Sequence, residues 1–380
     1  MRDVYSDDRI VMTLDAGGTN FVFSAIQGGK HLIKKKVLPS NSDDINNCLN
    51  TIVKGFKEVR NTLGANNSPS AISFAFPGPA DYKRGIIGDL TNFPSFNGGV
   101  ALGPMLENIF KVPTLINNDG DLFAYGEAIA GFLPYVNSTM KDKNLERRYT
   151  NLIGITIGTG FGAGIVVNNQ VCFGDNSAAG EIWLTRNYLA NDLIAEEGVS
   201  IRAIKRTYME LSNLKECHLE PKEIYLIAKG VLKGNKEAAI EAYGKVGTVI
   251  GESLATAITL MDAPVVIGGG ISGASEFIVP NIVEHLNGTI LDGNGRHINR
   301  IISKAFSIDD PKSFPKFLND NSQILDVPFS DKKVRYNPQK LIPIGLSRLG
   351  TSDAICLGAY TLAINYLEEK RASTPVYSRK

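Results

Sequence analysis

Short apolar runs that end in glycine-rich turns organise the first part of the chain and predict strands. The run Ile10–Leu14 stops at Asp15 and a glycine turn, and a second apolar run begins at Phe21. Two β-rich runs joined by a glycine turn are typical of a β-hairpin. The same order of strand, turn of glycine and threonine, and strand returns at residues 152–167. This repetition predicts a molecule built from two similar halves.

Helical spacing of apolar residues follows these hairpins over much of the chain. It predicts helices over residues 44–63, 104–110, 121–132, 199–213, 222–232, 236–261 and 352–369. Further strands are predicted at residues 71–76, 114–116 and 265–267. The polar residues 137–151 are typical of a solvated loop or a frayed helix, and the irregular residues 286–350 of long loops or an insertion. Strands and helices mixed in two halves predict an α/β fold.

Composition and charge exclude several classes of protein. The 380 residues include 40 Lys and Arg and 39 Asp and Glu, a net charge of +1, which argues against binding to nucleic acid or an anionic membrane. The four cysteines lie far apart, so neither a disulfide framework nor a cysteine-based zinc site is expected. No apolar run is long enough for a membrane helix, and the first residues lack a signal peptide's apolar stretch. We therefore expect a cytoplasmic enzyme.

The two glycine turns have the composition of phosphate-binding loops. Their residues are Gly17, Gly18, Thr19 and Asn20 in the first turn and Gly158, Thr159 and Gly160 in the second. Glycine lets backbone N–H groups converge on an anion, because no Cβ blocks the approach. A dinucleotide fingerprint is disfavoured, since the second turn leads into another strand and not into a helix. Neither the protein-kinase triplets HRD and DFG nor a GxxxxGK[ST] loop is found. Ordinary hairpin turns are the alternative.

Two carboxylates follow apolar strands at positions suited to chemistry. Asp15 is either an Asx-turn acceptor or an oxygen ligand, through water, of a phosphate-bound magnesium ion. Asp119 lies between the strand at 114–116 and a helix. It is either a helix cap or a general base that accepts the proton of a substrate hydroxyl in phosphoryl transfer. Asn92 and Asn118 are candidates to hydrogen-bond polyol oxygens.

Eight short motifs, taken in order, resemble those of the ROK family of bacterial sugar kinases. They are Asp15-Ala-Gly-Gly-Thr-Asn20, Phe76-Pro-Gly-Pro-Ala-Asp81, Thr91-Asn-Phe-Pro94, Asn118–Glu127, Ile157–Gly162, Ala179-Gly-Glu-Ile182, Gly268–Ile271 and Leu349–Asp353. A single motif of this kind is unspecific, but eight in the family's order are specific. The resemblance covers most of the chain and implies a glucokinase-like member of the hexokinase–actin–Hsp70 superfamily.

The resemblance implies a fold of two ribonuclease-H-like lobes, the actin-like ATPase architecture, with a cleft between them. Residues 1–120 would form a small N-terminal α/β lobe, on which a C-terminal helix at about 353–380 would pack back. Residues 121–352 would form a large lobe with sugar and nucleotide contacts. ATP would lie between the lobes, with Mg²⁺ as its partner ion.

The resemblance also implies a role for each candidate residue. The catalytic base would be Asp119. The substrate-binding residues would be Gly78, Thr91, Asn92, Asn118, Asp119, Glu181 and Glu196. The residues that bind ATP and its phosphates would be Asp15, Gly17, Gly18, Thr19, Asn20, Gly158, Thr159, Gly160, Gly269 and Gly270, with Asp15 holding Mg²⁺ through water.

Three departures separate this chain from the family pattern. Leu184 stands where the family commonly has a histidine, with Trp183 beside it. The family's CxCGxxGC zinc cluster is missing, so structural zinc is not expected. Residues 286–350 exceed the compact family pattern. Glu196, by contrast, keeps the E-x3-S spacing of the family's second sugar-binding glutamate.

The function predicted from these features is ATP-dependent phosphorylation of the 6-hydroxyl of glucose. N-acetylmannosamine, or another amino sugar or hexose, is the main alternative acceptor, because Leu184 alters the contact near carbons 1 and 2. A non-catalytic sugar sensor or repressor of the family is disfavoured, since the first strand begins at Ile10 and leaves no room for a preceding helix-turn-helix domain. Family analogy also suggests a homodimer.

Overall fold

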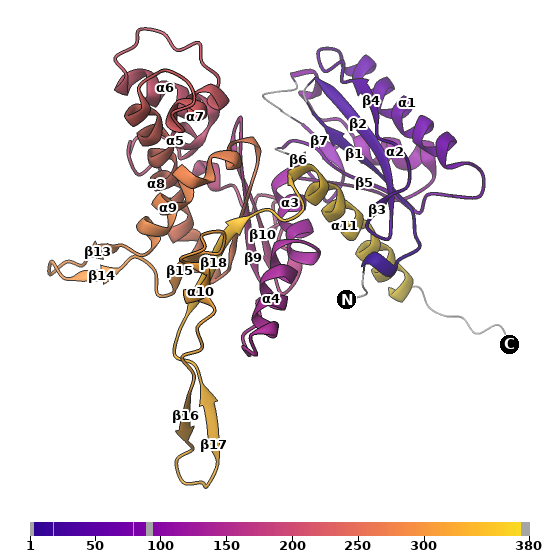
Figure 1. The fold of residues 1–380 in the computed structure, drawn as a ribbon. Helices are drawn as coiled ribbons and strands as arrows, with labels where there is room; N and C mark the ends of the chain where they lie inside the picture. Colours follow the sequence, from indigo (N-terminus) through magenta and orange to yellow (C-terminus); the bar gives the residue numbers. More distant parts are fainter. Residues whose placement is uncertain (1–3, 18, 79, 89–93, 374–380) are drawn as a thin grey trace. The chain divides into compact units, whose positions relative to one another are not determined.

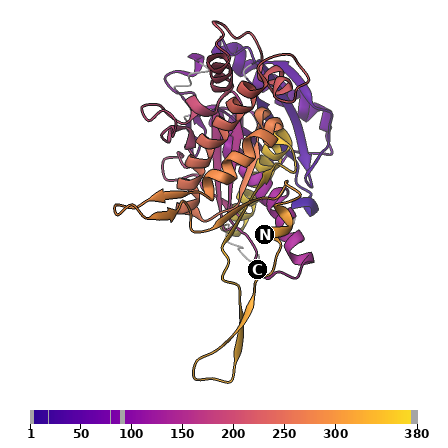
Figure 2. The same ribbon diagram turned by 60° about the vertical axis from the view of Figure 1, so that its left-hand side comes forward.

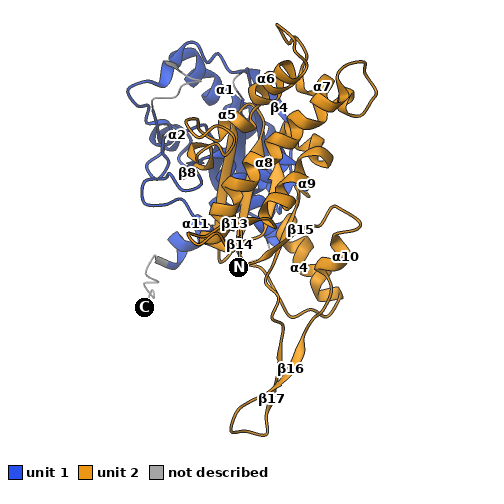
Figure 3. Cartoon of the chain, turned by 90° about the vertical axis from the view of Figure 1, so that its left-hand side faces the viewer, with its two compact units in different colours: residues 1–130, 170–180, 349–380 blue, residues 131–169, 181–348 orange. Residues whose placement is uncertain are grey.

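The computed structural model describes residues 4–17, 19–78, 80–88 and 94–373. The chain divides into two compact units (Figure 3). Unit 1 comprises residues 1–130, 170–180 and 349–380, and unit 2 comprises residues 131–169 and 181–348. The first boundary therefore follows residue 130, later than the boundary proposed from the sequence at residue 120. Unit 1 is assembled from segments that are far apart in the sequence, whereas the two segments of unit 2 are separated only by residues 170–180.

A mixed sheet forms the centre of unit 1 (Figure 1). Its strands are β1 (Val11–Ala16), β2 (Asn20–Gln27), β3 (Lys30–His31), β4 (Lys36–Pro39), β5 (Ala71–Ala75) and β8 (Thr114–Asn117). Their order is β3-β2-β1-β5-β8, with β4 also paired to β2. β1 and β2 form the first predicted hairpin, and β1, β5 and β8 run parallel. The carboxyl ends of these three strands therefore lie at one edge of the sheet.

Helices cover both faces of this sheet. They are α1 (Ile45–Leu63), α2 (Leu102–Phe110), α3 (Asp119–Ile129) and α11 (Thr351–Ser373). Met12 and Leu14 of β1 pack in one apolar core with α1 and α2, whereas Val11 packs in another with α11. Successive strand residues point to opposite faces, so β1 is buried on both sides. The short elements of the unit are η1 (Val4–Ser6), β6 (Ala80–Asp81), β7 (Ile86–Ile87), η2 (Pro94–Phe96) and β11 (Gln170–Val171).

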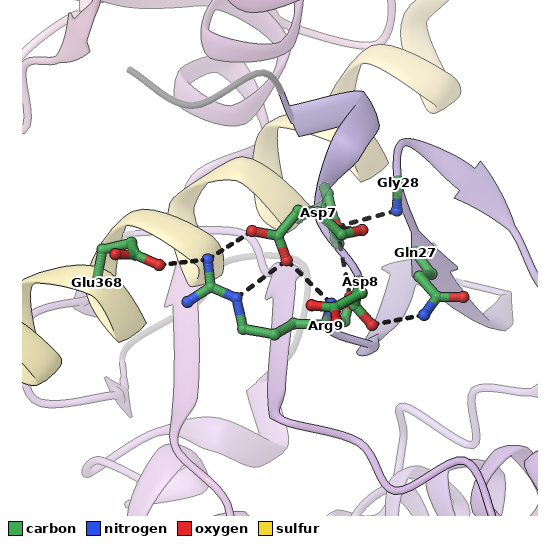
Figure 4. Close-up of polar contacts among 7 residues, drawn as sticks. Asp7, Asp8, Arg9, Gln27, Gly28 and Glu368 are labelled. Carbon is green, nitrogen blue, oxygen red and sulfur yellow. Dashed lines mark hydrogen bonds and ion pairs between the residues drawn. The ribbon is translucent and has the colours of Figure 1, made fainter.

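Polar contacts tie the segment before β1 to the C-terminal helix (Figure 4). The Arg9 guanidinium lies 2.5 Å from the Asp7 carboxylate and 2.9 Å from the Glu368 carboxylate of α11. Hydrogen bonding to Asp7 raises the pKa of Arg9. The backbone N–H of Gly28 donates to the Tyr360 hydroxyl of α11 at 3.0 Å. Together these contacts hold α11 against the β1–β2 hairpin.

A second mixed sheet forms the centre of unit 2. The strands of this sheet that belong to unit 2 are β9 (Leu152–Ile157), β10 (Phe161–Val167), β12 (Val265–Gly268), β15 (Lys304–Ser307) and β18 (Leu341–Leu346), in the order β10-β9-β12-β18-β15. β9 and β10 form the second predicted hairpin, and β9, β12, β18 and β15 are parallel. The main helices are α4 (Phe132–Asp142), α6 (Ile201–Leu211), α7 (Pro221–Ala228), α8 (Lys236–Met261) and α9 (Ser275–Leu286). Aliphatic residues of the sheet and of α6 to α9 form one core.

The remaining elements of unit 2 are short. They are η3 (Ile182–Leu184), α5 (Glu196–Val199), η4 (Gly270–Ala274), α10 (Phe314–Phe317) and two ribbons, β13 (Thr289–Leu291) with β14 (His297–Asn299) and β16 (Gln323–Asp326) with β17 (Lys333–Tyr336). Figure 2 shows the second ribbon extending far from the sheet of its unit. In the described part of the chain, no helix combines the length and apolar content that a membrane span requires.

Two of the structural predictions for unit 2 were partly wrong. The residues predicted as long loops or an insertion, 286–350, contain the sheet strands β15 and β18. Pro343 and Gly345 inside β18 obscure the strand pattern, because proline is rare in a central strand. The segment predicted as loop or frayed helix, 137–151, is helical as far as Asp142, the last residue of α4.

Candidate active site

Parallel strands bring the predicted acidic residues of unit 1 to one edge of its sheet. Asp15 of β1 is in register with Ala75 of β5, and Ala75 is in register with Asn117 of β8. The backbones of Asp15 and Asn117 are thus separated by one strand, about 10 Å at the usual spacing. Asp119 follows Asn117 closely, as the first residue of α3. The fold therefore brings Asp15 and Asp119, far apart in the sequence, to the same edge.

The start of α3 fixes the position of Asp119. The Asn118 side chain caps the helix by accepting the backbone N–H of Gly120 at 2.7 Å. The Asp119 carboxylate accepts the same N–H at 2.8 Å. A carboxylate in the first turn of a helix is also stabilised by the helix dipole. Asn118 thus supplies the cap, while Asp119 keeps a solvent-exposed surface, which chemistry at its carboxylate requires.

Electrostatics strengthen Asp119 as a base. Loss of water raises the pKa of its carboxyl group, the hydrogen bond from Gly120 opposes the rise, and the negative charge of Asp15 adds to it. Loss of water also raises the pKa of Asp15, and the Lys35 ammonium lowers it. A carboxylate with a raised pKa holds an accepted proton more firmly. Proton transfer from a substrate hydroxyl to Asp119 is correspondingly more favourable.

Two glycines allow α3 and α11 to cross in backbone contact. A Cβ on Gly126 of α3 would lie 2.0 Å from the Ala354 carbonyl oxygen. A Cβ on Gly358 of α11 would lie 2.0 Å from the Leu122 carbonyl oxygen. The crossing sets the position of α3 and hence of Asp119 at its start. The sequence analysis missed these positions, because a glycine within a helical pattern does not reveal which helix it contacts.

The first glycine turn closes on itself directly after β1. The Gly17 N–H donates to the Asn20 carbonyl oxygen at 3.1 Å, and a Cβ on Gly17 would lie 2.9 Å from that oxygen. Thr19 and Asn20 are exposed. Glycine is therefore required at this point of the turn, and polar groups face solvent beside Asp15, as a phosphate-binding loop needs.

The other predicted residues of unit 1 follow β5 or lie beyond the described ranges. Gly78 is exposed, and a Cβ there would lie 2.8 Å from the Tyr82 hydroxyl oxygen. Gly78 comes shortly after the carboxyl end of β5, the strand that pairs with β1, in which Asp15 lies. Gly18, Thr91 and Asn92 lie outside the described residues, so the structure adds nothing to their predicted roles.

The second glycine turn lies at the carboxyl end of β9 in unit 2. The Gly158 N–H donates to the Gly160 carbonyl oxygen at 3.0 Å, and the Ile201 N–H of α6 donates to the Gly158 carbonyl oxygen at 3.0 Å. Gly269, with a φ of +91°, follows the parallel strand β12, and a Cβ there would lie 2.3 Å from the Ile157 carbonyl oxygen. The predicted residues brought to this edge are Gly158, Thr159, Gly160, Gly269 and Gly270.

Glu196 contacts the second glycine turn. Its Oε2 accepts the backbone N–H of Phe161 at 3.1 Å, and its Oε1 lies 3.4 Å from the Arg202 guanidinium. A Cβ on Gly160 would lie 2.6 Å from Oε2. Glu196, predicted to bind sugar, therefore also supports the conformation of the turn. No motif in the sequence marks Arg202, which the sequence analysis missed.

Glu181, the other predicted sugar-binding glutamate, has a different neighbour. Its carboxylate accepts the indole N–H of Trp183, whose ring packs against the core of unit 2. Leu184, at the position of the family histidine, is 55% exposed. Trp183 thus orients Glu181, and Leu184 presents an apolar surface in place of an imidazole.

We expect Glu196→Ala to weaken ATP binding more than sugar binding, because it removes the acceptor that holds the second turn. A hydrogen bond to a charged group contributes about 1.5–3 kcal/mol, equivalent to about a 10- to 150-fold rise in the KM for ATP. Steady-state kinetics with each substrate varied in turn measure the effect. Glu197→Ala is the matched control, because Glu197 pairs with Arg202 and Arg206. A rise confined to the sugar KM would contradict the turn-supporting role.

Asp15 has the chemistry of a magnesium ligand. Its carboxylate is half-buried, and no described residue pairs with it by hydrogen bond or ion pair. Mg²⁺ prefers carboxylate oxygens and retains several waters, so a water-mediated contact fits this residue. Within the described ranges, no group of three or more His, Cys, Asp or Glu side chains could hold a metal ion by itself.

Comparison with known proteins connects this arrangement to a family. The ROK family pattern matches residues 11–311. A glucokinase from Halalkalibacterium halodurans is 26% identical over 308 residues, 73% of this chain and 85% of that protein. An N-acetyl-D-glucosamine kinase from Photobacterium profundum is 28% identical over 173 residues, 45% of this chain and 51% of that protein.

A solved structure matches the whole fold. The crystal structure of glucokinase from Parabacteroides distasonis is 48% identical, with a TM-score of 0.87, and the match covers 96% of this chain and 100% of that one. It confirms the fold class predicted from the sequence, the actin-like ATPase architecture. From its motifs, its fold and these comparisons, the chain belongs to the ROK family.

Proposed function

We propose that this chain transfers the γ-phosphoryl group of ATP to the 6-hydroxyl of glucose. The broader class, an ATP-dependent sugar kinase, follows from membership of the ROK family and from the similar glucokinases. The proposal rests mainly on Asp119, an exposed carboxylate at the start of a helix, at the sheet edge that also carries Asp15 and the first glycine turn.

In the proposed reaction, Asp119 accepts the proton of the sugar hydroxyl as its oxygen attacks the γ-phosphorus and ADP leaves. Phosphoryl transfer passes through a loose transition state, so the proton moves late and most of the catalysis comes from positioning and charge stabilisation. The cap by Asn118 and the crossing at Gly126 supply that positioning for the base.

Backbone N–H groups of the two glycine turns would hold the phosphates of ATP. The residues proposed to bind ATP and its phosphates are Asp15, Gly17, Gly18, Thr19, Asn20, Gly158, Thr159, Gly160, Gly269 and Gly270. Mg²⁺, when bound with ATP, would neutralise phosphate charge, and Asp15 would hold it through water. The proposal requires that both turns act on the same ATP molecule, because neither unit carries all of these residues.

The sugar hydroxyls would be bound by polar side chains and by the backbone of one glycine. We propose Gly78, Thr91, Asn92, Asn118, Glu181 and Glu196 for this role. The Trp183 contact leaves Glu181 with further lone pairs to accept hydroxyl protons. The exposed Leu184 near this glutamate favours a sugar without a charged group at that position, which is compatible with glucose.

An N-acetylated amino sugar is the second candidate acceptor. N-acetyl-D-glucosamine kinases are among the similar proteins, and the apolar Leu184 side chain can pack against an acetyl methyl group. The two candidates differ only in the substituent at carbon 2, so they share the proposed base and phosphate-binding residues.

A panel of sugars with ATP tests the proposal. ADP release is measured with glucose, mannose, N-acetylglucosamine and N-acetylmannosamine, and the kcat/KM values are compared. We expect the highest value for glucose. A higher value for an N-acetylated sugar would replace glucose with the second candidate, and no release above the sugar-free rate with any hexose would overturn the proposed function.

A further inference from the structure

A short loop of unit 2, defined as residues 185–195, joins the two glutamates proposed to bind the sugar. Glu181 precedes the loop, and Glu196 follows it directly as the first residue of α5. The two ends of the loop are tied together, because the Ala195 N–H donates to the Thr185 carbonyl oxygen at 2.7 Å. The separation of the two glutamates therefore depends on the contacts that hold this loop.

The helix α8 holds the base of the loop through a pair of hydroxyl groups. The Thr185 hydroxyl donates to the Ile182 carbonyl oxygen at 2.7 Å, and its oxygen lies 2.8 Å from the Ser253 Oγ of α8. A hydroxyl group has one hydrogen to donate, so Ser253 donates to Thr185. Because Ser253 is buried, little water competes for this hydrogen bond. The base of the loop is thereby fixed to α8.

The tip of the loop contacts a histidine of α9 that is bound to α8. The Tyr188 ring and the His285 imidazole lie edge to face, with their centroids 4.9 Å apart and an angle of 74° between the ring planes. The His285 Nε2 lies 2.8 Å from the Glu252 Oε2 of α8. A carboxylate only accepts hydrogen bonds, so Nε2 donates to it. The Tyr188 ring thus packs against an imidazole that Glu252 orients.

Further contacts prevent this imidazole from moving. The Arg300 guanidinium donates to both Glu252 carboxylate oxygens, at 3.0 Å and 2.6 Å. Loss of water raises the pKa of Glu252, but hydrogen bonds from Arg300 and His285 lower it below its ordinary value, so the carboxylate stays charged. The helices α8 and α9 lie side by side (Figure 1), and a Cβ on Gly251 would lie 2.8 Å from the His285 Cβ. His285 is therefore a rigid support for Tyr188.

The support is buried, whereas the aromatic ring that it carries is not. The side chains of His285, Arg300 and Glu252 are 15%, 16% and 26% exposed, so salt screens their interaction less than that of a surface ion pair. Tyr188 is 51% exposed. Its ring can therefore be removed without opening the core of the unit, and the loop would lose only its contact with the support.

We propose that Tyr188 is a positioning residue for sugar binding and acts through its contact with His285. It holds the loop in place and so sets the separation of Glu181 and Glu196. The proposal rests on the proposed function, in which these glutamates bind sugar hydroxyls. Side chains that are held in place before binding lose less conformational entropy when the sugar binds. ATP binding depends less on the loop, because Phe161 and its glycine turn hold Glu196 directly.

The sugar affinity of Tyr188→Ala tests the proposal. An edge-to-face aromatic contact changes an equilibrium constant by about 2- to 10-fold, so we expect the Kd and the KM for the sugar to rise by that factor. The kcat, the KM for ATP and the temperature of unfolding should change little. Calorimetry with the panel sugar that binds most tightly gives the Kd, and steady-state kinetics give the other constants.

Two matched variants separate positioning from a general effect on the loop. Tyr188→Phe keeps the ring and should restore the sugar affinity of the wild-type chain. Leu189→Ala removes the neighbouring side chain, which is 50% exposed, and should leave the sugar affinity unchanged. Hydrogen exchange follows the loop without substrate. The Asn187 N–H, which donates to the Leu193 carbonyl oxygen at 2.9 Å, should exchange faster in Tyr188→Ala than in Tyr188→Phe.

The outcomes for the loop and for the reaction are distinguishable. An unchanged sugar Kd in Tyr188→Ala, an equal rise in Leu189→Ala, no recovery in Tyr188→Phe, or equal exchange of the Asn187 N–H in the two tyrosine variants would overturn the proposal. A wild-type chain that binds sugar but releases no ADP would overturn the proposed reaction alone, because the Kd values do not depend on turnover.

Discussion

Replacing Asp119 with alanine is expected to lower kcat by about 100- to 10,000-fold, the usual contribution of a general base, while sugar binding is largely retained. The carboxylate is exposed at the start of α3, and its raised pKa suits proton acceptance. Coupled assays of ADP release give kcat, and calorimetry gives the sugar affinity. A variant that keeps more than about a tenth of kcat would remove Asp119 from the role of base.

The Asp119→Asn variant tests whether activity is lost without a loss of stability. Its side-chain oxygen can still accept the Gly120 N–H, so the start of α3 is preserved. Because partial loss of water raises the pKa of the Asp119 carboxyl group, its ionised form is disfavoured in the folded state at pH values above the ordinary aspartate pKa. The free energy of unfolding therefore decreases as the pH rises through that range. The asparagine variant should therefore unfold at the same temperature as the wild type or higher. Inactivity without destabilisation is the expected pattern.

Gly126→Ala is expected to destabilise unit 1 and to reduce activity with it. The added Cβ would lie 2.0 Å from the Ala354 carbonyl oxygen, so α3 and α11 must move apart. Overpacking of this kind costs about 1–3 kcal/mol or more. At about 2–4 °C per kcal/mol for a unit of this size, the Tm should fall by about 5 °C or more. Differential scanning calorimetry measures the change.

Gly244→Ala is the matched control for this change. Gly244 lies inside α8, and a Cβ there would lie 3.5 Å from the nearest atom, on the Asn281 side chain, an ordinary contact. Alanine is favoured over glycine in a helix by about 1 kcal/mol, so this variant should be neutral or more stable. Equal Tm values for Gly126→Ala and the wild type would show that the close crossing is not required.

Local patterns were sufficient to predict the two hairpins and the acidic residues that follow apolar strands. Ile10–Leu14 and residues 152–157 are mainly apolar runs that end at glycine turns, and each hairpin occurs where it was expected. β18 could not be predicted in this way. Pro343 and Gly345 are compatible with that strand only because its neighbours on both sides complete the sheet, and long-range pairing leaves no local signal.

The candidate site likewise contains residues that local patterns identify and contacts that they do not reveal. Asp15 and Asp119 were identified from their positions after strands, and their proximity follows from the parallel order β1-β5-β8. The glycine crossing of α3 with α11 and the contact of Glu196 with Phe161 join residues distant in the sequence. Such contacts depend on the packing of whole elements, which a single sequence does not reveal.

The product of the reaction provides the most direct test of the central claim. Wild-type and Asp119→Asn chains are incubated with glucose, ATP and Mg²⁺, and the phosphorus species are followed by ³¹P NMR. The account predicts glucose 6-phosphate and ADP in equal amounts for the wild-type chain, and almost none for the variant at matched protein concentration. Free phosphate in place of a sugar phosphate, or equal product from both chains, would contradict it.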